Sequence, residues 1–179
     1  MPPAVFLDRD GVINKTQVRD GRPYAPRLIE EFALLPGVNE AIGKLKGFGF
    51  RVIVVTNQPD VRTGKTALAT VQAMHKIVLE QLGVDAIKVC YHVDQDACAC
   101  RKPKPGMLLE AAKEWDIDLV RSFMVGDRWR DIEAGQAAGC RTVLVGQGYD
   151  GEKKVMADFE VASLLEASHV ILKAGGRAG

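Results

Sequence analysis

Short apolar runs alternate with amphipathic segments along most of this chain, and this alternation restricts its fold more than any other feature. The runs Ala4–Leu7 and Arg51–Val55 are dominated by aliphatic side chains, as expected for strands that are buried on both faces. The same pattern predicts further strands at Ala86–Tyr91, Ser122–Val125, Arg141–Val145 and Ser168–Leu172.

Segments with helical spacing separate these strands, and the longest of them ends at Gly83, a residue that favours helix termination. Because strands alternate with helices, we expect an α/β fold of three layers, a parallel sheet with helices on both faces. The length of 179 residues suits one domain, assigned to residues 1–172, and the glycine-rich residues 173–179 are expected to form a frayed tail. The expected helices are Asn39–Lys46, Thr66–Leu82, Gly106–Trp115 and Ile132–Ala138.

Composition and charge exclude several classes of protein. The chain has 24 basic and 23 acidic residues, and a net charge of +1 argues against a strongly basic nucleic-acid-binding protein. No apolar run reaches the ~20 residues that span a bilayer. The first residues lack the basic region of a signal peptide and soon meet Asp8. We therefore expect a cytoplasmic protein without nucleic-acid or membrane partners.

Polar side chains follow the predicted strands at the point where each strand ends. Asp8 and Asp10 follow the first strand, Thr56 the second and Asp127 the fourth, while Lys102 comes soon after the third. Ligands of parallel α/β sheets bind beyond the carboxyl ends of the strands, so these side chains are expected to meet. Carboxylates next to a lysine and a hydroxyl suit Mg²⁺ with a phosphate beside it.

This set of side chains predicts phosphoryl chemistry. One aspartate can attack phosphorus to form an aspartyl-phosphate, which water then hydrolyses. A second aspartate two residues later can protonate the leaving oxygen and afterwards activate the water. The lysine and the metal ion offset the charge of the transferred group.

A second cluster of potential ligands lies between residues 90 and 100. Cys90, His92, Cys98 and Cys100 supply three thiolates and one imidazole, which is a complete tetrahedral set for Zn²⁺. Because a catalytic zinc ion usually keeps one position open, the complete set favours a structural role. The alternative is three buried thiols with a chance histidine. Cys140 precedes a strand and is expected to lie in the core.

The four strand-end motifs, in this order, resemble those of the haloacid dehalogenase superfamily of phosphatases. The resemblance covers nearly the whole chain. It implies that Asp8 is the nucleophile, Asp10 the acid/base and Thr56 the phosphate-binding hydroxyl, and that Lys102 offsets charge. It also implies the ligands of Mg²⁺, which would be Asp8, the backbone carbonyl of Asp10 and Asp127, with Asp131 in support.

The loop motif Cys100-Arg101-Lys102-Pro103 narrows the resemblance to one branch of that superfamily. This branch contains phosphatases of D-glycero-D-manno-heptose 1,7-bisphosphate and the histidinol-phosphatase domain. The segment Asn57–Gly64 departs from the branch, because Asp60 replaces a glycine and an arginine is displaced by one position. The spacing of the cysteine and histidine ligands does not decide between the two substrates.

The chain is too short for a cap domain over the site, so loops must select the substrate. These loops are rich in cations, which favours an anionic sugar phosphate as the substrate. We expect the substrate to be heptose 1,7-bisphosphate and the reaction to remove its C7 phosphate. The alternative substrates are histidinol phosphate and a nucleic-acid end. The alternative function is a zinc-stapled binding module that has lost catalysis. Without a cap to close, we expect a monomer. The expected substrate contacts are Asn14, Asn57, Arg101 and Lys104.

Overall fold

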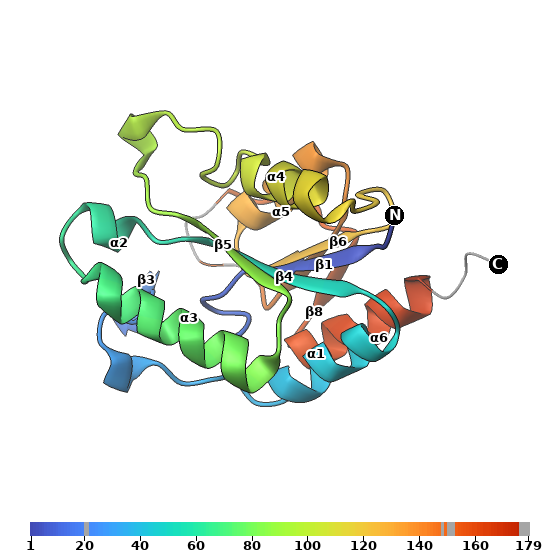
Figure 1. Ribbon diagram of the computed structural model, residues 1–179, viewed down its shortest axis with the longest axis horizontal. Helices are drawn as coiled ribbons and strands as arrows, with labels where there is room; N and C mark the ends of the chain where they lie inside the picture. The colour runs from blue at the N-terminus through green and yellow to red at the C-terminus, as the bar shows by residue number, and fades with distance from the viewer. Residues whose placement is uncertain (20–21, 148, 150–152, 176–179) are drawn as a thin grey trace.

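The computed structural model describes residues 1–19, 22–147, 149 and 153–175. Its centre is a six-stranded sheet in the order β5-β4-β1-β6-β7-β8, in which every neighbouring pair is parallel (Figure 1). The strands are β1 (Ala4–Leu7), β4 (Arg51–Asn57), β5 (Ala86–Cys90), β6 (Phe123–Gly126), β7 (Arg141–Val145) and β8 (Phe159–Val161). The predicted three-layer α/β fold is confirmed.

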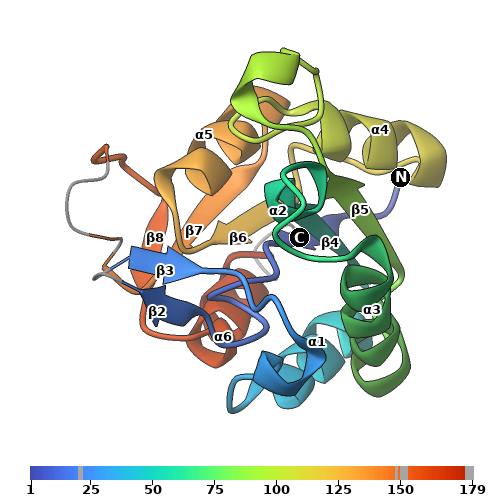
Figure 2. The same cartoon turned by 90° about the vertical axis from the view of Figure 1, so that its left-hand side faces the viewer.

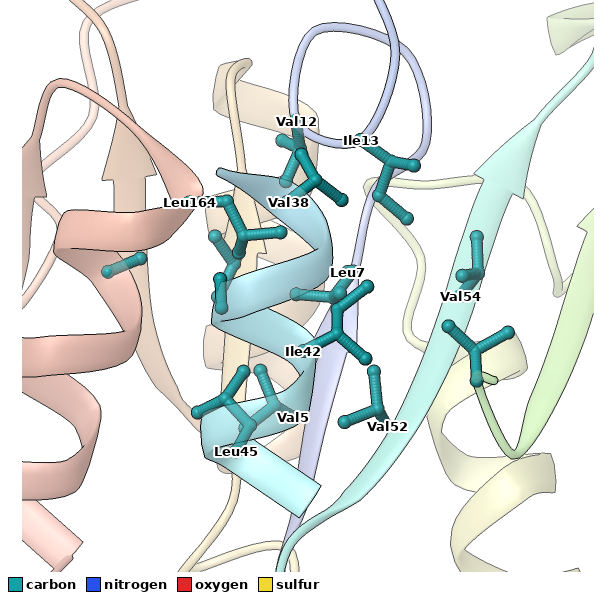
Figure 3. Close-up of a cluster of buried hydrophobic side chains, with 14 of the residues drawn as sticks. Val5, Leu7, Val12, Ile13, Val38, Ile42, Leu45, Val52, Val54 and Leu164 are labelled. Atoms are coloured by element: carbon teal, nitrogen blue, oxygen red, sulfur yellow. The ribbon is translucent and has the colours of Figure 1, made fainter. Parts of the chain in front are cut away.

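Helices cover both faces of this sheet. One face carries α1 (Val38–Gly47), α3 (Leu68–Leu82) and α6 (Leu164–Gly175), and the other carries α4 (Gly106–Trp115) and α5 (Trp129–Ala138) (Figure 1). Strand β1 shows why both faces must be covered, since Val5 and Leu7 pack in one hydrophobic cluster and Ala4 and Phe6 in the other. Figure 3 shows the first cluster, in which α1 lies directly over β1 and β4.

Smaller elements lie at the carboxyl edge of the sheet. The strands β2 (Gln17–Arg19) and β3 (Arg22–Tyr24) form an antiparallel pair, followed by the 3-10 helix η1 (Ile29–Glu31). The short helix α2 (Pro59–Arg62) follows β4, and the 3-10 helix η2 (Asp94–Asp96) lies in the loop after β5. Figure 2 looks onto this edge, with the β2–β3 pair, α2 and the η2 loop around it. Among the described residues no separate cap domain stands between these elements.

The predicted last strand was wrong. Residues Ser168–Leu172, predicted as a strand, belong to α6, because the apolar positions continue at helical spacing from Leu164 to Ile171. The last strand is instead the three-residue β8, which is too short to give a clear alternating pattern. Part of the predicted frayed tail is also helical, since α6 extends to Gly175. Residues 176–179 lie outside the described residues.

Cys140 is buried in the second hydrophobic cluster, as predicted. No helix among the described residues has both the length and the apolar character needed to cross a membrane.

Close packing of α5 on the sheet generates a stability prediction at Gly135. A Cβ atom there would lie 2.6 Å from Cβ of Met124 and 2.9 Å from Cγ2 of Thr142, closer than packed atoms approach. We expect Gly135→Ala to lower the free energy of unfolding by ~1–3 kcal/mol, because overpacking outweighs the gain in helix propensity. Urea denaturation monitored by circular dichroism measures the change.

The matched control is Gly43→Ala in α1, where an added Cβ meets no atom within 4 Å. This variant should be stabilised by up to ~1 kcal/mol, because alanine favours the helix and nothing opposes it. Equal effects of the two substitutions would contradict the packing argument.

Candidate active site

The ammonium group of Lys102 lies at the centre of the polar cluster. Its Nζ donates hydrogen bonds to Oδ1 of Asp8 at 2.8 Å, Oδ1 of Asp131 at 2.6 Å and the carbonyl oxygen of Val55 at 2.8 Å. The side chain is only 2% exposed. Three elements therefore meet at one buried cation: the end of β1, the end of β4 and the first turn of α5.

Asp127 extends this cluster from the residue after β6. Its Oδ2 accepts a hydrogen bond of 2.6 Å from the hydroxyl group of Tyr149, whereas Oδ1 is buried and has no partner among the described residues. The side chain reaches this place because residue 11 is a glycine: its φ is +88°, and a Cβ there would lie 2.0 Å from Oδ2 of Asp127.

The cluster holds more negative charge than Lys102 neutralises. Carboxylate oxygens of Asp8, Asp127 and Asp131 all lie within 4.8 Å of one another. Burial, together with the charge of Asp131, raises the pKa of Asp8 to about 7 against the opposing effect of Lys102. Burial and the charge of Asp8 likewise raise the pKa of Asp127 well above its usual value. Three carboxylates around one ammonium group, with one oxygen unpartnered, fit a hard divalent cation.

Asp131 has both of its oxygens engaged by the protein. While Oδ1 contacts Lys102, Oδ2 accepts a hydrogen bond of 3.1 Å from the backbone nitrogen of Arg128. This second bond caps the first turn of α5 and fixes the carboxylate at the helix N-terminus.

The carboxylate of Asp10 is held by a separate group of donors. Its Oδ1 accepts from Nη2 of Arg9 at 3.0 Å and from Nδ2 of Asn14 at 2.9 Å, and its Oδ2 accepts from Nε2 of Gln58 at 2.8 Å. Burial alone would raise the pKa of Asp10, but the charge of Arg9 and the hydrogen bonds lower it below the usual value. In this arrangement the donors favour the ionised form of the Asp10 carboxyl group.

Thr56 and Asn57 lie at the end of β4 and contact the side chain of Gln58 and the backbone of Lys102, respectively. The hydroxyl oxygen of Thr56 accepts a hydrogen bond of 2.9 Å from Nε2 of Gln58, which leaves the hydroxyl hydrogen to donate. Asn57 exchanges two hydrogen bonds of 3.1 Å with the backbone of Lys102, one from Nδ2 to the carbonyl oxygen and one from the backbone nitrogen to Oδ1. The loop that carries Lys102 is thus tied to β4.

A cavity of about 540 Å³ opens above these side chains. Asp8, Asp10, Asp127 and Asp131 line it, and four arginines, Arg22, Arg101, Arg128 and Arg130, line it as well. Of the predicted substrate contacts, Asn57 and Arg101 line the cavity. Asn14 is fully buried against Asp10, and Nζ of Lys104 donates to the carbonyl oxygens of Ala97 and Cys98, so neither lines it.

The four predicted ligands of the second cluster also come together. Sγ of Cys100 lies 3.1 Å from Sγ of Cys90, 3.5 Å from Sγ of Cys98 and 3.3 Å from Nδ1 of His92. None of these cysteines forms a disulfide. The group could hold a metal ion. The loop packs tightly on α4, since a Cβ at Gly106 would lie 2.3 Å from the carbonyl oxygen of Ala99.

Sequence reasoning missed Tyr149 and the cavity-lining Arg22, Arg128 and Arg130 as site residues. Tyr149 follows the strand β7, so the rule applied to the earlier strands, which considers the residues after each strand end, would have found it. The three arginines belong to the cation-rich loops and the last motif, but the sequence could not single them out, because surface arginines are common in any sequence.

Removal of the central ammonium group should destabilise the fold strongly. We expect Lys102→Met to lower the free energy of unfolding by ~3–5 kcal/mol in the absence of divalent cations, because it leaves two buried carboxylates without their partner. Urea denaturation measures the loss.

The control is Lys88→Met, since Lys88 also pairs with two carboxylates, those of Glu110 and Glu114. Both partners are more than half exposed, at 65% and 53%, so the loss there should stay below ~1 kcal/mol. Losses of equal size in the two variants would show that burial does not govern the effect.

Comparison with known proteins identifies relatives of this chain. Residues 99–167 match the family model described as HAD-hydrolase-like. The D-glycero-beta-D-manno-heptose-1,7-bisphosphate 7-phosphatase of Rhodopseudomonas palustris is 36% identical over 180 residues, which cover 90% of this chain and 94% of the relative. The protein of the same name from Escherichia coli K12 is 36% identical over 186 residues, covering 96% and 94%.

Solved structures that resemble this chain include heptose bisphosphate phosphatases as well. The D,D-heptose 1,7-bisphosphate phosphatase of B. bronchiseptica, crystallised with magnesium and phosphate, superposes with a TM-score of 0.81 at 33% identity, covering 96% of this chain and 99% of that one. The corresponding protein of Burkholderia thailandensis gives 0.67 at 28% identity, covering 95% and 98%. With the fold, the four strand-end motifs and these relatives in agreement, the chain belongs to the HAD-like hydrolases, in the family of the heptose-1,7-bisphosphate phosphatases.

Proposed function

We propose that this protein is a Mg²⁺-dependent phosphatase that removes the C7 phosphate of D-glycero-D-manno-heptose 1,7-bisphosphate. The observation that carries the proposal is the buried cluster of Asp8, Asp127, Asp131 and Lys102 beneath a cavity lined by four arginines. The names of the relatives support the choice of substrate. The magnesium and phosphate bound to the B. bronchiseptica relative support the choice of metal ion.

Two aspartates perform the covalent chemistry in this proposal. Before the reaction Asp10 takes up a proton, although Arg9 lowers its pKa, and Asp8 is ionised. An oxygen of Asp8 attacks phosphorus and the bond between phosphorus and the ester oxygen breaks, while the protonated Asp10 carboxyl group gives its proton to the departing alcohol. Water then attacks the aspartyl-phosphate and gives a proton to Asp10, and the bond between phosphorus and Asp8 breaks. The products are the alcohol and inorganic phosphate, and both aspartates return to their initial state.

Other groups stabilise the transferred phosphoryl group. Lys102 lies 2.8 Å from Asp8, close enough to offset charge on the phosphate, and the hydroxyl group of Thr56 can donate to a phosphate oxygen. Mg²⁺, when held by Asp8, the backbone carbonyl of Asp10 and Asp127, supplies further positive charge at this place. Asp131 positions Lys102 and does not itself bind the phosphate, because both of its oxygens already accept hydrogen bonds from the protein.

The cavity lining favours a substrate with a second phosphate. Arg101 lines the cavity and has a buried Nη1 without a partner among the described residues, so this atom is available to an anion. Asp60 also lines the cavity, but it is paired with Arg27 at 2.9 Å. Histidinol phosphate carries a cationic amine, which would therefore find few unpaired carboxylates away from the catalytic cluster. For this reason histidinol phosphate is the second candidate substrate.

We assign the four expected substrate residues to two different tasks. Asn57 and Arg101 line the cavity and contact the substrate. Asn14 acts through Asp10, to which it donates a hydrogen bond, and Lys104 acts through the loop whose carbonyl groups it binds.

We further propose that Cys90, His92, Cys98 and Cys100 hold one structural Zn²⁺ ion. Five of the six distances among their ligand atoms are 3.1 to 3.7 Å, near the ~3.8 Å separation of sulfur atoms in a tetrahedral zinc site, and all four atoms lie within 4.8 Å of one another. The ion would fix the loop that ends at Lys102. Zinc binding needs reduced thiols, which supports the proposal that the protein is cytoplasmic. We also propose that the protein acts as a single-domain monomer.

Turnover of a panel of phosphate esters in Mg²⁺ tests the proposed activity. We expect heptose 1,7-bisphosphate to give a higher kcat/KM than fructose 1,6-bisphosphate or histidinol phosphate, measured by phosphate release. A preference for histidinol phosphate would overturn the argument from the arginines. Turnover of none of the three would favour a binding module that has lost catalysis.

Asp8→Asn provides the mechanistic control. It should abolish phosphate release while the circular dichroism spectrum remains that of the wild type, because an amide cannot act as the nucleophile. Asp118→Asn, a change near the opposite edge of the sheet where the backbone nitrogen of Asp118 meets Pro2, should keep full activity.

Metal analysis tests the structural zinc site. We expect about one zinc ion per chain, its loss in Cys98→Ser and its retention in Cys140→Ala, since Cys140 lies in the hydrophobic core. Chelation should speed hydrogen exchange in residues 90–101 before it weakens Mg²⁺ binding. Equal zinc content in the two variants would place the ion elsewhere.

A further inference from the structure

Arg9 is a fully buried arginine that stands between the two catalytic aspartates in the sequence. Its guanidinium group contacts Oδ1 of Asp10 through Nε at 3.2 Å and through Nη2 at 3.0 Å. It also lies over the ring of Phe32, 5.7 Å from the ring centre. The side chain is therefore held on several sides, and the Asp10 carboxylate serves as its counterion.

The remaining nitrogen of this guanidinium group meets a histidine. Nη1 of Arg9 lies 3.1 Å from Nε2 of His75, which comes from the middle of α3. An arginine can only donate hydrogen bonds, so Nε2 of His75 must be the unprotonated acceptor. Burial and the charge of Arg9 lower the pKa of His75 to about 4, which keeps the imidazole neutral near pH 7.

Among the described residues, no cavity or metal-ligand role accounts for a histidine at position 75. It is 8% exposed and lies on the face of α3 that also buries Val71, Met74 and Val78, where an apolar residue would pack without a desolvation cost. It neither lines the cavity nor belongs to either group of metal-ligand candidates among the described residues. The hydrogen bond of its imidazole ring is made with Arg9.

We propose that His75 and Arg9 are positioning residues that fix the carboxylate of Asp10 for proton transfer. The proposal rests on the proposed function, in which Asp10 is the acid/base. Arg9 and Asn14 donate hydrogen bonds to Oδ1 of Asp10, and Gln58 donates one to Oδ2 of the same carboxylate. His75 fixes the far end of the guanidinium group, so that the group cannot turn away from Asp10.

This role matters because general acid catalysis depends on geometry. The acid must lie within hydrogen-bond reach of the leaving oxygen, and a correctly placed acid contributes on the order of 10²–10⁴ in rate. A carboxylate that can rotate loses part of this factor. The loss should be confined to substrates whose alcohol needs a proton to leave.

Two esters with different leaving groups test this idea. Heptose 1,7-bisphosphate releases a strongly basic alcohol, whereas p-nitrophenyl phosphate releases a phenolate that departs without a proton. We expect His75→Leu to lower kcat/KM about tenfold for the bisphosphate and less than twofold for p-nitrophenyl phosphate. The ratio kcat/KM is used because it reports only the steps up to departure of the alcohol.

His75→Gln is the matched conservative variant. Its amide oxygen can accept the hydrogen bond from Arg9, so kcat/KM for the bisphosphate should stay within twofold of the wild type. An equal fall for both esters in His75→Leu, or a failure of glutamine to restore the bisphosphate rate, would overturn the proposal. Should the leucine variant not fold, Arg9→Lys, which keeps the charge but not the two-pronged contact, gives the same comparison.

Asp10→Asn separates this proposal from the proposed function. If Asp10 is the acid, its replacement must lower the bisphosphate rate far more than the p-nitrophenyl rate. With that result, an unchanged ratio in His75→Leu rejects only the positioning role. An unchanged ratio in Asp10→Asn, or a wild-type protein that hydrolyses neither ester, rejects the acid role of Asp10 and the positioning role with it.

Discussion

The hydrogen bonds from the buried ammonium group of Lys102 to Asp8 and Asp131 are the interactions on which the rest of the site depends. A carboxylate without a partner is very costly to bury, and here one cation serves two of them at the ends of different elements. The same ammonium group also bonds to the carbonyl oxygen of Val55. One side chain thus joins β1, β4 and α5 at the carboxyl edge of the sheet.

The placement of Lys102 depends in turn on the loop that precedes it. Asn57 holds its backbone from β4. On the other side, Asp94 in the same loop accepts hydrogen bonds from Arg101 at 2.7 Å and from Arg130 at 3.2 Å, which links the loop to α5. The cluster of three cysteines and one histidine lies within this loop, so an ion held there would limit the movement of the lysine. The cluster of cysteines and histidine is therefore linked through this loop to the candidate active site.

Sequence reasoning succeeded where a feature followed from strand order alone. The long strands and the polar residues after them could be predicted, because a parallel sheet brings all of its carboxyl ends to one edge. Short elements such as β8 and the β2–β3 pair could not, since three residues show no periodicity. The partners of the site residues were also hidden. His75 sits at an ordinary position on an amphipathic helix, and only the fold shows that it faces Arg9, 66 residues away.

Loop contacts explain how a chain without a separate cap among its described residues can still present a defined cavity. Arg27, after the β2–β3 pair, bonds to Asp60 of α2 at 2.9 Å, and the hydroxyl group of Thr66 donates to the backbone carbonyl of Arg27 at 2.7 Å. These bonds join the segment after β3, whose Ala25 lines the cavity, to the segment that contains α2, whose Asp60 lines it as well. The carboxylate of Asp60 makes the ion pair with Arg27. This ion pair joins the segment after β3 to α2, whose residues Pro59 and Asp60 line the cavity.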